Sequence, residues 1–263
     1  MQTKALLQEF LRTHTTLELL PCGKGFYCAH REDAPQKPAI ALRADFDALA
    51  TPDGGAAHLC GHDGHAASLC AAALEPEGKT VGRNVFLLFQ PAEETGAGAG
   101  PCCELFQTEH MDEIYGAHNL PGFPAGVVFT RPGTFACASG GVTLRAEHNV
   151  DPEKLRTSVL GCAKALCEEA GLGFSFEEQD VFPATENDGA CADKVLSLTG
   201  GRVLNVPMRW SEDFGHYLLH IPGAFFGIGA GEHHAPLHTA RYEYPDSLLE
   251  PTANAFWALI QGA

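Results

Sequence analysis

Residues 84–90, NVFLLFQ, form a short and continuous apolar run. A run of this kind, without polar alternation, is typical of a strand that is buried on both faces of a sheet. Helical patterns flank it, from about Gly64 to Leu74 and around Gly98–Phe106, and a further extended segment, PAIALRADF, covers residues 38–46. Strands that alternate with helices predict an α/β fold, here a three-layer αβα sandwich with a mixed, largely parallel central sheet.

The second half of the chain continues this alternation. A helix is predicted to open at Asp151-Pro152-Glu153, because Asp suits the N-cap and Pro suits the first helical position. The segment FSFEEQDVF, residues 174–182, predicts a strand, and the segments 190–200 and 212–220 predict helices. No linker or internal repeat interrupts the pattern, so we expect one domain.

The composition excludes several classes of partner. The chain has 263 residues, 45% of them hydrophobic, which is enough to bury a core without disulfides. Its net charge of −16 argues against nucleic acid or an anionic membrane surface as the main partner, because both require a basic surface. The first twenty residues resemble an amphipathic helix rather than a signal peptide, so we expect a soluble cytoplasmic protein.

The 10 cysteines fall below the density of small disulfide-rich domains. Several of them, such as Cys70, Cys162 and Cys167, lie in predicted helices beside Ala and Leu, where a reduced cysteine packs as a small apolar residue. We interpret nine as structural or incidental. The exception is Cys60.

Ligand-type side chains follow the predicted strands. In sheets of this class, ligands bind beyond the carboxyl ends of the strands. The segments that carry such side chains are RADFDAL (43–49), HLCGHDGH (58–65), FQPAEETGAG (89–98), YGAHNLPG (115–122) and GEHHAPLH (231–238). An isolated Glu-Glu pair is usually a solvated surface, and isolated histidines are more often incidental than ligands. Recurrence at every strand end in the first half favours a site for Zn²⁺ or a related ion.

These segments, in their order and spacing, resemble the aminoacylase/carboxypeptidase metallopeptidase family. The resemblance is closer to its amidohydrolase branch, which contains hippurate hydrolases, N-acyl amino acid deacylases and auxin-conjugate hydrolases. The later segments SEDFGHYL, FFGIGAG and LHTARYEYPDSLL match as well. The resemblance implies an α/β catalytic domain and two divalent metal ions, with Zn²⁺ favoured and Mn²⁺, Ni²⁺ or Co²⁺ as alternatives.

The resemblance also implies roles for single residues. The implied metal ligands are Cys60, His62, Glu94, His118 and His238. Glu93 would be the general base, and Asp47 would be a supporting carboxylate that orients a ligand. Asp45, Asp63 and His65 would structure the loops, whereas His233 and His234 match no ligand position of the family.

The implied chemistry is hydrolysis of an amide bond. The metal ions would lower the pKa of a bound water towards about 7 and polarise the substrate carbonyl. Glu93 would accept the proton of the attacking water and deliver it to the departing amine. Adjacent glutamates suit these two roles only on irregular backbone, which Pro91 and the nearby glycines favour.

One interval departs from the family pattern. Members normally carry a lid or dimerisation domain of four strands and two helices, inserted between a strand region ending near Arg145 and a helix beginning near Pro152. Here that interval is AEHNVDP, residues 146–152. We therefore expect a single catalytic metallohydrolase domain over residues 1–263, with the lid missing near residues 146–151. The protein would be a monomer, or an oligomer that does not use a lid.

Three functions remain open on the sequence. The first is a dinuclear amidohydrolase for small N-acyl amino acids or short peptides. The second is a metal-binding homologue with weak or no catalysis that acts as a binding module or within a complex, and the third is a scaffold without metal. Retention of both Glu93 and Glu94 favours the first. His148 is either a remnant of the lid histidine that stabilises the oxyanion or a loop histidine at the shortened junction, and we favour the latter.

Overall fold

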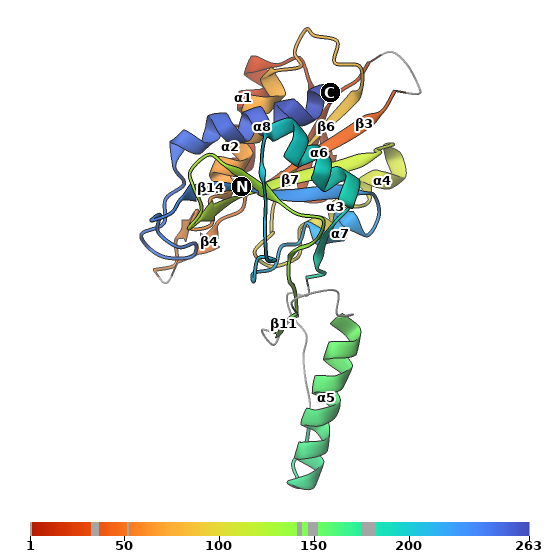
Figure 1. Ribbon diagram of the computed structural model, residues 1–263, viewed down its shortest axis with the longest axis vertical. Coiled ribbons are helices and arrows are strands. Elements are labelled where there is room, and N and C mark those ends of the chain that lie inside the picture. The colour runs from red at the N-terminus through yellow and green to blue at the C-terminus, as the bar shows by residue number, and fades with distance from the viewer. Residues whose placement is uncertain are drawn as a thin grey trace.

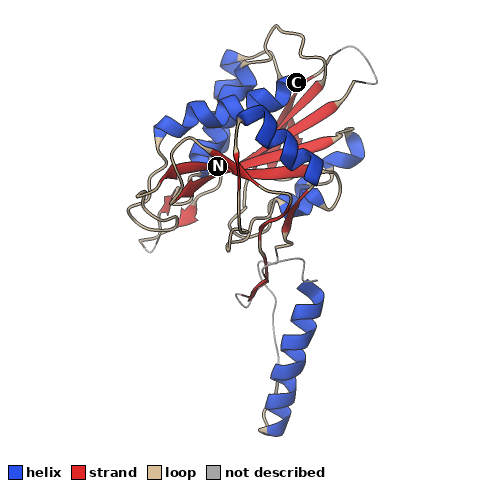
Figure 2. Ribbon diagram, in the orientation of Figure 1, coloured by secondary structure: helices blue, strands red, loops and turns tan. Residues whose placement is uncertain are grey.

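The computed structural model describes residues 2–32, 37–51, 53–140, 144–146, 152–174 and 182–262. Its centre is an eight-stranded mixed sheet with helices on both faces (Figure 1, Figure 2). This architecture is the three-layer α/β sandwich that the sequence predicts.

The centre of the sheet is parallel, and antiparallel pairs flank it on both sides, with β13 parallel to β8 at one edge. Its strands follow the order β1 (Glu18–Cys22), β2 (Gly25–His30), β6 (Asn84–Gln90), β3 (Ala39–Asp45), β7 (Glu113–Pro121), β14 (Gly223–Gly231), β8 (Val128–Thr130) and β13 (Arg202–Val203). Strands β6, β3, β7 and β14 run parallel, whereas β1 against β2, β2 against β6 and β14 against β8 are antiparallel. The carboxyl ends of the four parallel strands therefore meet at one edge.

Side-chain alternation along the strands divides the core into two layers. In β3, Ile40 and Leu42 belong to the cluster on one face of the sheet, whereas Ala39 and Ala41 belong to the cluster on the other. Every residue of β3 is buried. This burial on both faces explains why the central strands have continuous apolar sequences.

The helices form the two outer layers. One face carries α1 (Gln2–His14), α2 (His62–Leu74), α6 (Gly189–Thr199) and α8 (Leu249–Gln261), the last preceded by the 3-10 turn η1 (Asp246–Leu248). The other face carries the short helices α3 (Ala99–Cys102), α4 (Leu105–Thr108) and α7 (Gly215–Leu218). Among the described residues, none of the helices has the length and apolar character that a membrane span requires.

One segment lies apart from the sandwich. Outside the main sheet the described residues form the ladders β4 (Leu49–Ala50) with β5 (Ala56–Ala57), β9 (Gly133–Ala136) with β12 (Thr185–Asn187), and β10 (Ala138–Gly140) with β11 (Leu144–Ala146). Helix α5 (Pro152–Glu169) then projects away from the body of the molecule (Figure 1). None of its described side chains is buried. The junction with His148 lies outside the described residues, so the missing lid and the single domain stay predictions.

Two predicted helices differ from the structure. The segment 98–106 forms two short helices, α3 and α4, rather than one. In the segment 212–220 only Gly215–Leu218 is α-helical. The first two residues of that segment, Glu212 and Asp213, instead direct their carboxylates to a buried arginine. The predicted strand 174–182 lies mostly outside the described residues.

Candidate functional site

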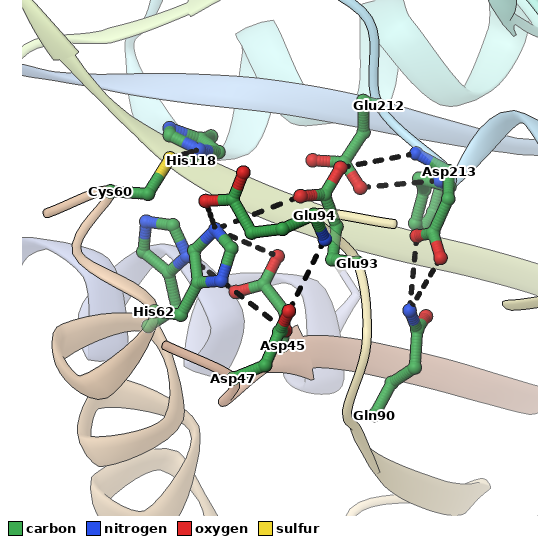
Figure 3. Close-up of polar contacts among 12 residues, drawn as sticks. Asp45, Asp47, Cys60, His62, Gln90, Glu93, Glu94, His118, Glu212 and Asp213 are labelled. Carbon is green, nitrogen blue, oxygen red and sulfur yellow. Dashed lines mark hydrogen bonds and ion pairs between the residues drawn. The ribbon is translucent and has the colours of Figure 1, made fainter. Parts of the chain in front are cut away.

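The candidate site lies where the parallel strands end. Asp45 ends β3, Gln90 ends β6 and leads to Glu93 and Glu94, and His118 lies near the carboxyl end of β7. The backbone thus gathers at one edge side chains that are far apart in the sequence. Figure 3 shows these residues pointing toward one another.

Cys60 contacts two histidines from different segments. It lies just before α2, and its Sγ atom is 3.4 Å from His118 Nε2 and 3.2 Å from His238 Nε2. Two possible ligand groups share this sulfur, one with His62 and His118 and the other with Glu94 and His238. In each group the donor atoms lie within 4.8 Å of one another. A thiolate at this position could therefore contact two ions at once. We call Cys60, His62, Glu94, His118 and His238 the ligand cluster.

Buried atoms without partners test whether the ligand cluster fits metal ions. Both ring nitrogens of His62 and the Oε1 atom of Glu94 are buried and make no hydrogen bond. Glu94 Oε1 is 3.4 Å from His238 Nε2, and Cys60 Sγ is 3.4 Å from His118 Nε2, each pair within one ligand group. Two ligands at about 2.0–2.3 Å from one tetrahedral zinc ion are separated by roughly 3.3–3.8 Å. The spacing and the donor types therefore fit divalent metal ions.

Neighbouring groups orient the ligands. His118 Nδ1 lies 2.8 Å from the carbonyl oxygen of Asn119, which suits an N–H donor and leaves Nε2 free toward Cys60. His62 Nδ1 faces Asp47 Oδ1 at 3.3 Å. The other carboxylate oxygen of Asp47 accepts the backbone N–H of Glu94 at 3.2 Å. Asp47 thus contacts two members of the ligand cluster and lies where a supporting carboxylate would act.

Protonation of the histidines follows from their surroundings. Burial, together with the charge of His65, holds the pKa of His118 well below its ordinary value, so the ring is neutral and able to bind a metal. Burial acts in the same direction on His62, but the charges of Asp45 and Cys60 outweigh it and raise the pKa well above its ordinary value. Hydrogen bonds to Cys60 and Glu94 raise the pKa of His238 to about 10. The site therefore attracts positive charge.

Glu93 lies beside the ligand cluster, and its side chain is almost fully buried. It is 6% exposed, and its Oε2 atom is 3.9 Å from His62 Nε2. Burial raises the pKa of Glu93 well above its usual range, and the charge of Glu212 adds to the shift. A carboxylate whose pKa is raised in this way can accept a proton near neutral pH. The backbone N–H of Asp213 donates to its Oε1 atom at 3.4 Å.

A second buried cluster supports this region. The guanidinium of Arg43 is fully buried and contacts Asp45 at 2.7 Å, Asp213 at 2.7 Å and Glu212 at 3.1 Å. Its Nε atom donates to Gln90 Oε1 at 2.9 Å. We call Arg43, Asp45, Gln90, Glu212 and Asp213 the arginine cluster. Because Gln90 precedes the loop with Glu93 and Glu94, this cluster anchors that loop to the segment before α7.

The backbone is strained at two site positions. Within the described residues, Ala92 and His238 are the two non-glycine residues with positive φ, at 62° and 59°. Such conformations concentrate at functional sites, where the surroundings hold them in place. Gly61 has φ of 92°, and a Cβ there would lie 2.6 Å from Asn119 Oδ1. Only glycine therefore fits between Cys60 and His62.

Sequence reasoning missed the arginine cluster and the aromatic side of the site. An arginine inside an apolar strand was an available signal, because arginine is rarely buried unless it is paired. The segment SEDFGHYL contains Glu212 and Asp213 but did not indicate their contacts. No feature of the sequence indicated that Trp210 packs against the site, where its ring centroid is 5.0 Å from that of His118. Asp45 and His65, which were expected to structure the loops, lie together, with His65 Nδ1 2.7 Å from Asp45 Oδ1.

Comparisons with known proteins relate the whole chain to a family of hydrolases. Residues 41–262 match the family described as Peptidase family M20/M25/M40. N-acetyldiaminopimelate deacetylase of Leuconostoc citreum is 26% identical over 346 residues, covering 98% of this chain and 88% of that protein. N-acetyl-L-cysteine deacetylase of Bacillus subtilis is 42% identical over 113 residues, covering 38% of this chain and 27% of that protein.

A solved structure shares the fold. The YXEP protein of Bacillus subtilis, described as a dinuclear metal binding peptidase from the M20 family, superposes with a TM-score of 0.79. It is 21% identical in sequence, and the match covers 98% of this chain and 90% of that one. The α/β architecture is therefore that of a known dinuclear metal-binding peptidase.

Proposed function

This chain belongs to the M20/M25/M40 peptidase family, and from that premise we propose that it hydrolyses the amide bond of small N-acyl amino acids or short peptides. Its relatives include deacetylases and carboxypeptidases, and family membership makes it a metal-dependent amidohydrolase or metallopeptidase. The substrate class follows the names of two deacetylase relatives, which act on N-acetylated amino acids.

The observation that carries the proposal is the shared position of Cys60. One sulfur lies within 3.4 Å of two histidines that belong to separate ligand groups, as a two-ion site requires. We assign His62 and His118 to one ion, Glu94 and His238 to the other, and Cys60 to both. Thiolate and imidazole favour borderline-soft ions, so Zn²⁺ is the first candidate, with Mn²⁺, Co²⁺ and Ni²⁺ as alternatives.

The chain's own residues complete the reaction. When bound, the ions lower the pKa of water and polarise a carbonyl group. The Glu93 carboxylate accepts a proton from the attacking water and then delivers it to the amine nitrogen as the amide bond breaks. The N–H of Asp213 holds one oxygen of this carboxylate, and its other oxygen faces His62. Asp47 keeps His62 and the Glu94 backbone in place.

This environment favours an enzyme over a metal-binding homologue without catalysis. A protein that only binds metal has no need of a second buried carboxylate with a raised pKa beside the ligands. We also keep the prediction that the lid is missing. The alignment with the Leuconostoc deacetylase runs over 346 residues although this chain has 263, which supports a shortened chain relative to that enzyme. A cytoplasmic location and a monomer, or an oligomer without lid contacts, stay predictions.

The test is a hydrolysis screen. Metal-free protein would receive Zn²⁺, Mn²⁺, Co²⁺ or Ni²⁺ and then be assayed with N-acetyl amino acids and dipeptides. Glu93→Gln is the matched control, because it keeps size and hydrogen-bonding reach but removes the base. We expect its hydrolysis to fall by roughly 10² or more with metal content unchanged. Near-native turnover of Glu93→Gln contradicts the role of the base, and no hydrolysis under any metal favours the binding homologue.

A further inference from the structure

A pair of buried cysteines lies outside the site described above. Cys22 ends the edge strand β1 and Cys102 ends α3, and the two side chains are 6% and 1% exposed. The Cys22 thiol donates to the carbonyl oxygen of Cys102 at 3.6 Å, and the Cys102 thiol donates to the carbonyl oxygen of Cys22 at the same distance. Each thiol is therefore directed at the backbone of the other residue, which places the two side chains next to each other.

The pair lies beneath an exposed turn. Gly23 and Lys24, which connect β1 to β2, are both exposed. A Cβ at Gly23 would lie 3.6 Å from Cys102 Sγ, so this turn covers the thiol directly. The sulfur atoms therefore lie directly below an exposed part of the chain.

From this geometry we propose that Cys22 and Cys102 form a reversible disulfide that is made by oxidation with a peroxide. The Cys102 sulfur attacks one peroxide oxygen, the O–O bond breaks, and the leaving hydroxide takes up a proton to give water and a sulfenic acid. The Cys22 sulfur then attacks the sulfenic sulfur, and the S–O bond breaks with release of a second water. Two thiols are oxidised and one peroxide is reduced to two waters.

The surroundings of the two thiols distinguish their roles. Hydrogen bonds from Cys22 and Tyr217 lower the pKa of Cys102, although its burial opposes them. The thiol of Cys102 therefore ionises more readily than that of Cys22, which makes Cys102 the nucleophile of the pair. Cys103, the next residue along the chain, has a pKa raised to about 12 by burial and serves as the natural comparison.

A series of polar contacts connects the pair to the catalytic loop. Tyr217 is close enough to Cys102 to lower the pKa of its thiol, and the Tyr217 hydroxyl donates to Gln90 Oε1 at 2.7 Å. Gln90 Nε2 donates to the Asp213 carboxylate at 2.8 Å, and the Asp213 N–H donates to Glu93. A disulfide removes the thiol hydrogen and the negative charge that the Cys102 sulfur can carry beside Tyr217. Oxidation should therefore lower kcat several-fold with little change in KM, an expectation that rests on the proposed function.

Peptide mapping tests the disulfide without any assay of activity. Metal-loaded protein would be treated with hydrogen peroxide, its free thiols alkylated, and its non-reduced digest analysed by mass spectrometry. We expect a linked peptide pair containing Cys22 and Cys102, a higher unfolding temperature, and reversal of both by dithiothreitol. Recovery of these cysteines as separate alkylated or sulfinic species, or linked to other cysteines, overturns the proposal.

Variants of single cysteines show which sulfur causes the loss of activity after treatment with peroxide. Cys102→Ser removes the sulfur that is oxidised first and keeps Cys60 and every other thiol, so a peroxide effect that persists in this variant comes from elsewhere and overturns the coupling. Cys103→Ser is the matched control and should still form the linked pair. If the disulfide forms in the wild-type protein but kcat is equal before and after oxidation, the coupling through Tyr217 is wrong. If no hydrolysis is found at all, the proposed function fails, whereas the mapping still decides the disulfide.

Discussion

Two polar clusters lie side by side at the carboxyl edge of the sheet (Figure 3). They differ in whether their buried polar atoms have hydrogen-bond or ion-pair partners within the protein. In the arginine cluster, the guanidinium of Arg43 contacts three carboxylates and the amide of Gln90. In the ligand cluster, His62 and Glu94 keep buried atoms that make no hydrogen bond. Most members of both clusters are buried, with His238 the most exposed, but the hydrogen-bond partners of the two clusters differ.

This difference separates a structural role from a binding role. Buried charge is costly unless it is paired, and the arginine cluster meets that requirement with the protein's own groups. The ligand cluster does not, because both ring nitrogens of His62 and one carboxylate oxygen of Glu94 are buried without a hydrogen bond. Divalent metal ions would satisfy these atoms. Substitutions in the two clusters should therefore have different consequences.

The largest effect is expected from loss of a member of the ligand cluster. We expect His118→Ala and His238→Ala to lower the bound metal and to reduce hydrolysis to background. The fold should persist, because the core consists of apolar strands and the His238 side chain is 52% exposed. Elemental analysis and circular dichroism measure the two outcomes. His233→Ala is the control, since this exposed residue of the same loop belongs to no ligand group of the described residues. Full metal content in His118→Ala or His238→Ala contradicts the assignment.

The arginine cluster should respond in the opposite way. Arg43→Met leaves three buried carboxylates without a cation, and loss of one partner of a buried ion pair costs about 3–5 kcal/mol. Urea unfolding at a fixed metal concentration measures this loss of stability. Arg31→Met is the matched control, because Arg31 pairs with Glu109 but its side chain is 49% exposed. An exposed pair contributes about 0–1 kcal/mol. Equal losses in the two variants would show that Arg43 is not the anchor of this edge.

The two clusters also differ in how far the sequence could reveal them. The strand-end rule and the spacing of CGHDGH and QPAEE are sufficient to predict that Cys60, His62, Glu93 and Glu94 meet at one edge. The sharing of one sulfur between two ligand groups could not be predicted, because it depends on the three-dimensional approach of His118 and His238.

The arginine cluster was hidden for a physical reason. Arg43 lies within an apolar strand, and its partner Asp213 is 170 residues away in the chain. Propensity favours a helix across residues 212–220, but the ion pairs of Glu212 and Asp213 with Arg43 override it and leave only α7 helical. Apart from the arginine within an apolar strand, tertiary contacts of this kind leave no local pattern in the sequence.

A smaller effect is expected in substrate recognition. Arg43 is buried and already paired, so it cannot bind the carboxylate of a substrate, and a missing lid would supply no other cation. A charge-assisted hydrogen bond contributes about 1.5–3 kcal/mol, or roughly 10–150-fold in affinity. Without one, kcat/KM for an N-acetyl amino acid and for its carboxamide should differ by less than about tenfold, with a high KM for both.

Steady-state kinetics with the two substrates decides this point. A low KM with strong preference for the free carboxylate would show that the chain holds the carboxylate elsewhere, and the account of the missing lid would then be wrong. The candidates would be Arg131, Arg209 and Arg241. Arg209 precedes Trp210, which packs beside His118, and Arg209→Ala would be the first variant to examine.

The smallest effect is expected at Glu32, a carboxylate near the surface that has an ion-pair partner and hydrogen-bond donors. Glu32 forms an ion pair with Lys37 and accepts the backbone N–H groups of Val81 and Gly82. The Lys37 hydrogen bond and these N–H groups lower the pKa of Glu32 from 4.5 to about 2, although burial opposes the shift. Because the pKa is lowered in the folded state, this stabilisation is complete above about pH 4.5 and is lost as the pH falls toward 2.

Glu32→Gln should therefore lower the free energy of unfolding at pH 7 by about 1 kcal/mol or less, as for other ion pairs near the surface. The difference from the wild-type protein should shrink as the pH falls below 4.5, because protonated Glu32 and glutamine carry the same charge. Urea unfolding of both proteins at several pH values measures this convergence. A difference that stays constant between neutral and acidic pH would show that shape, rather than charge, determines the contribution of Glu32.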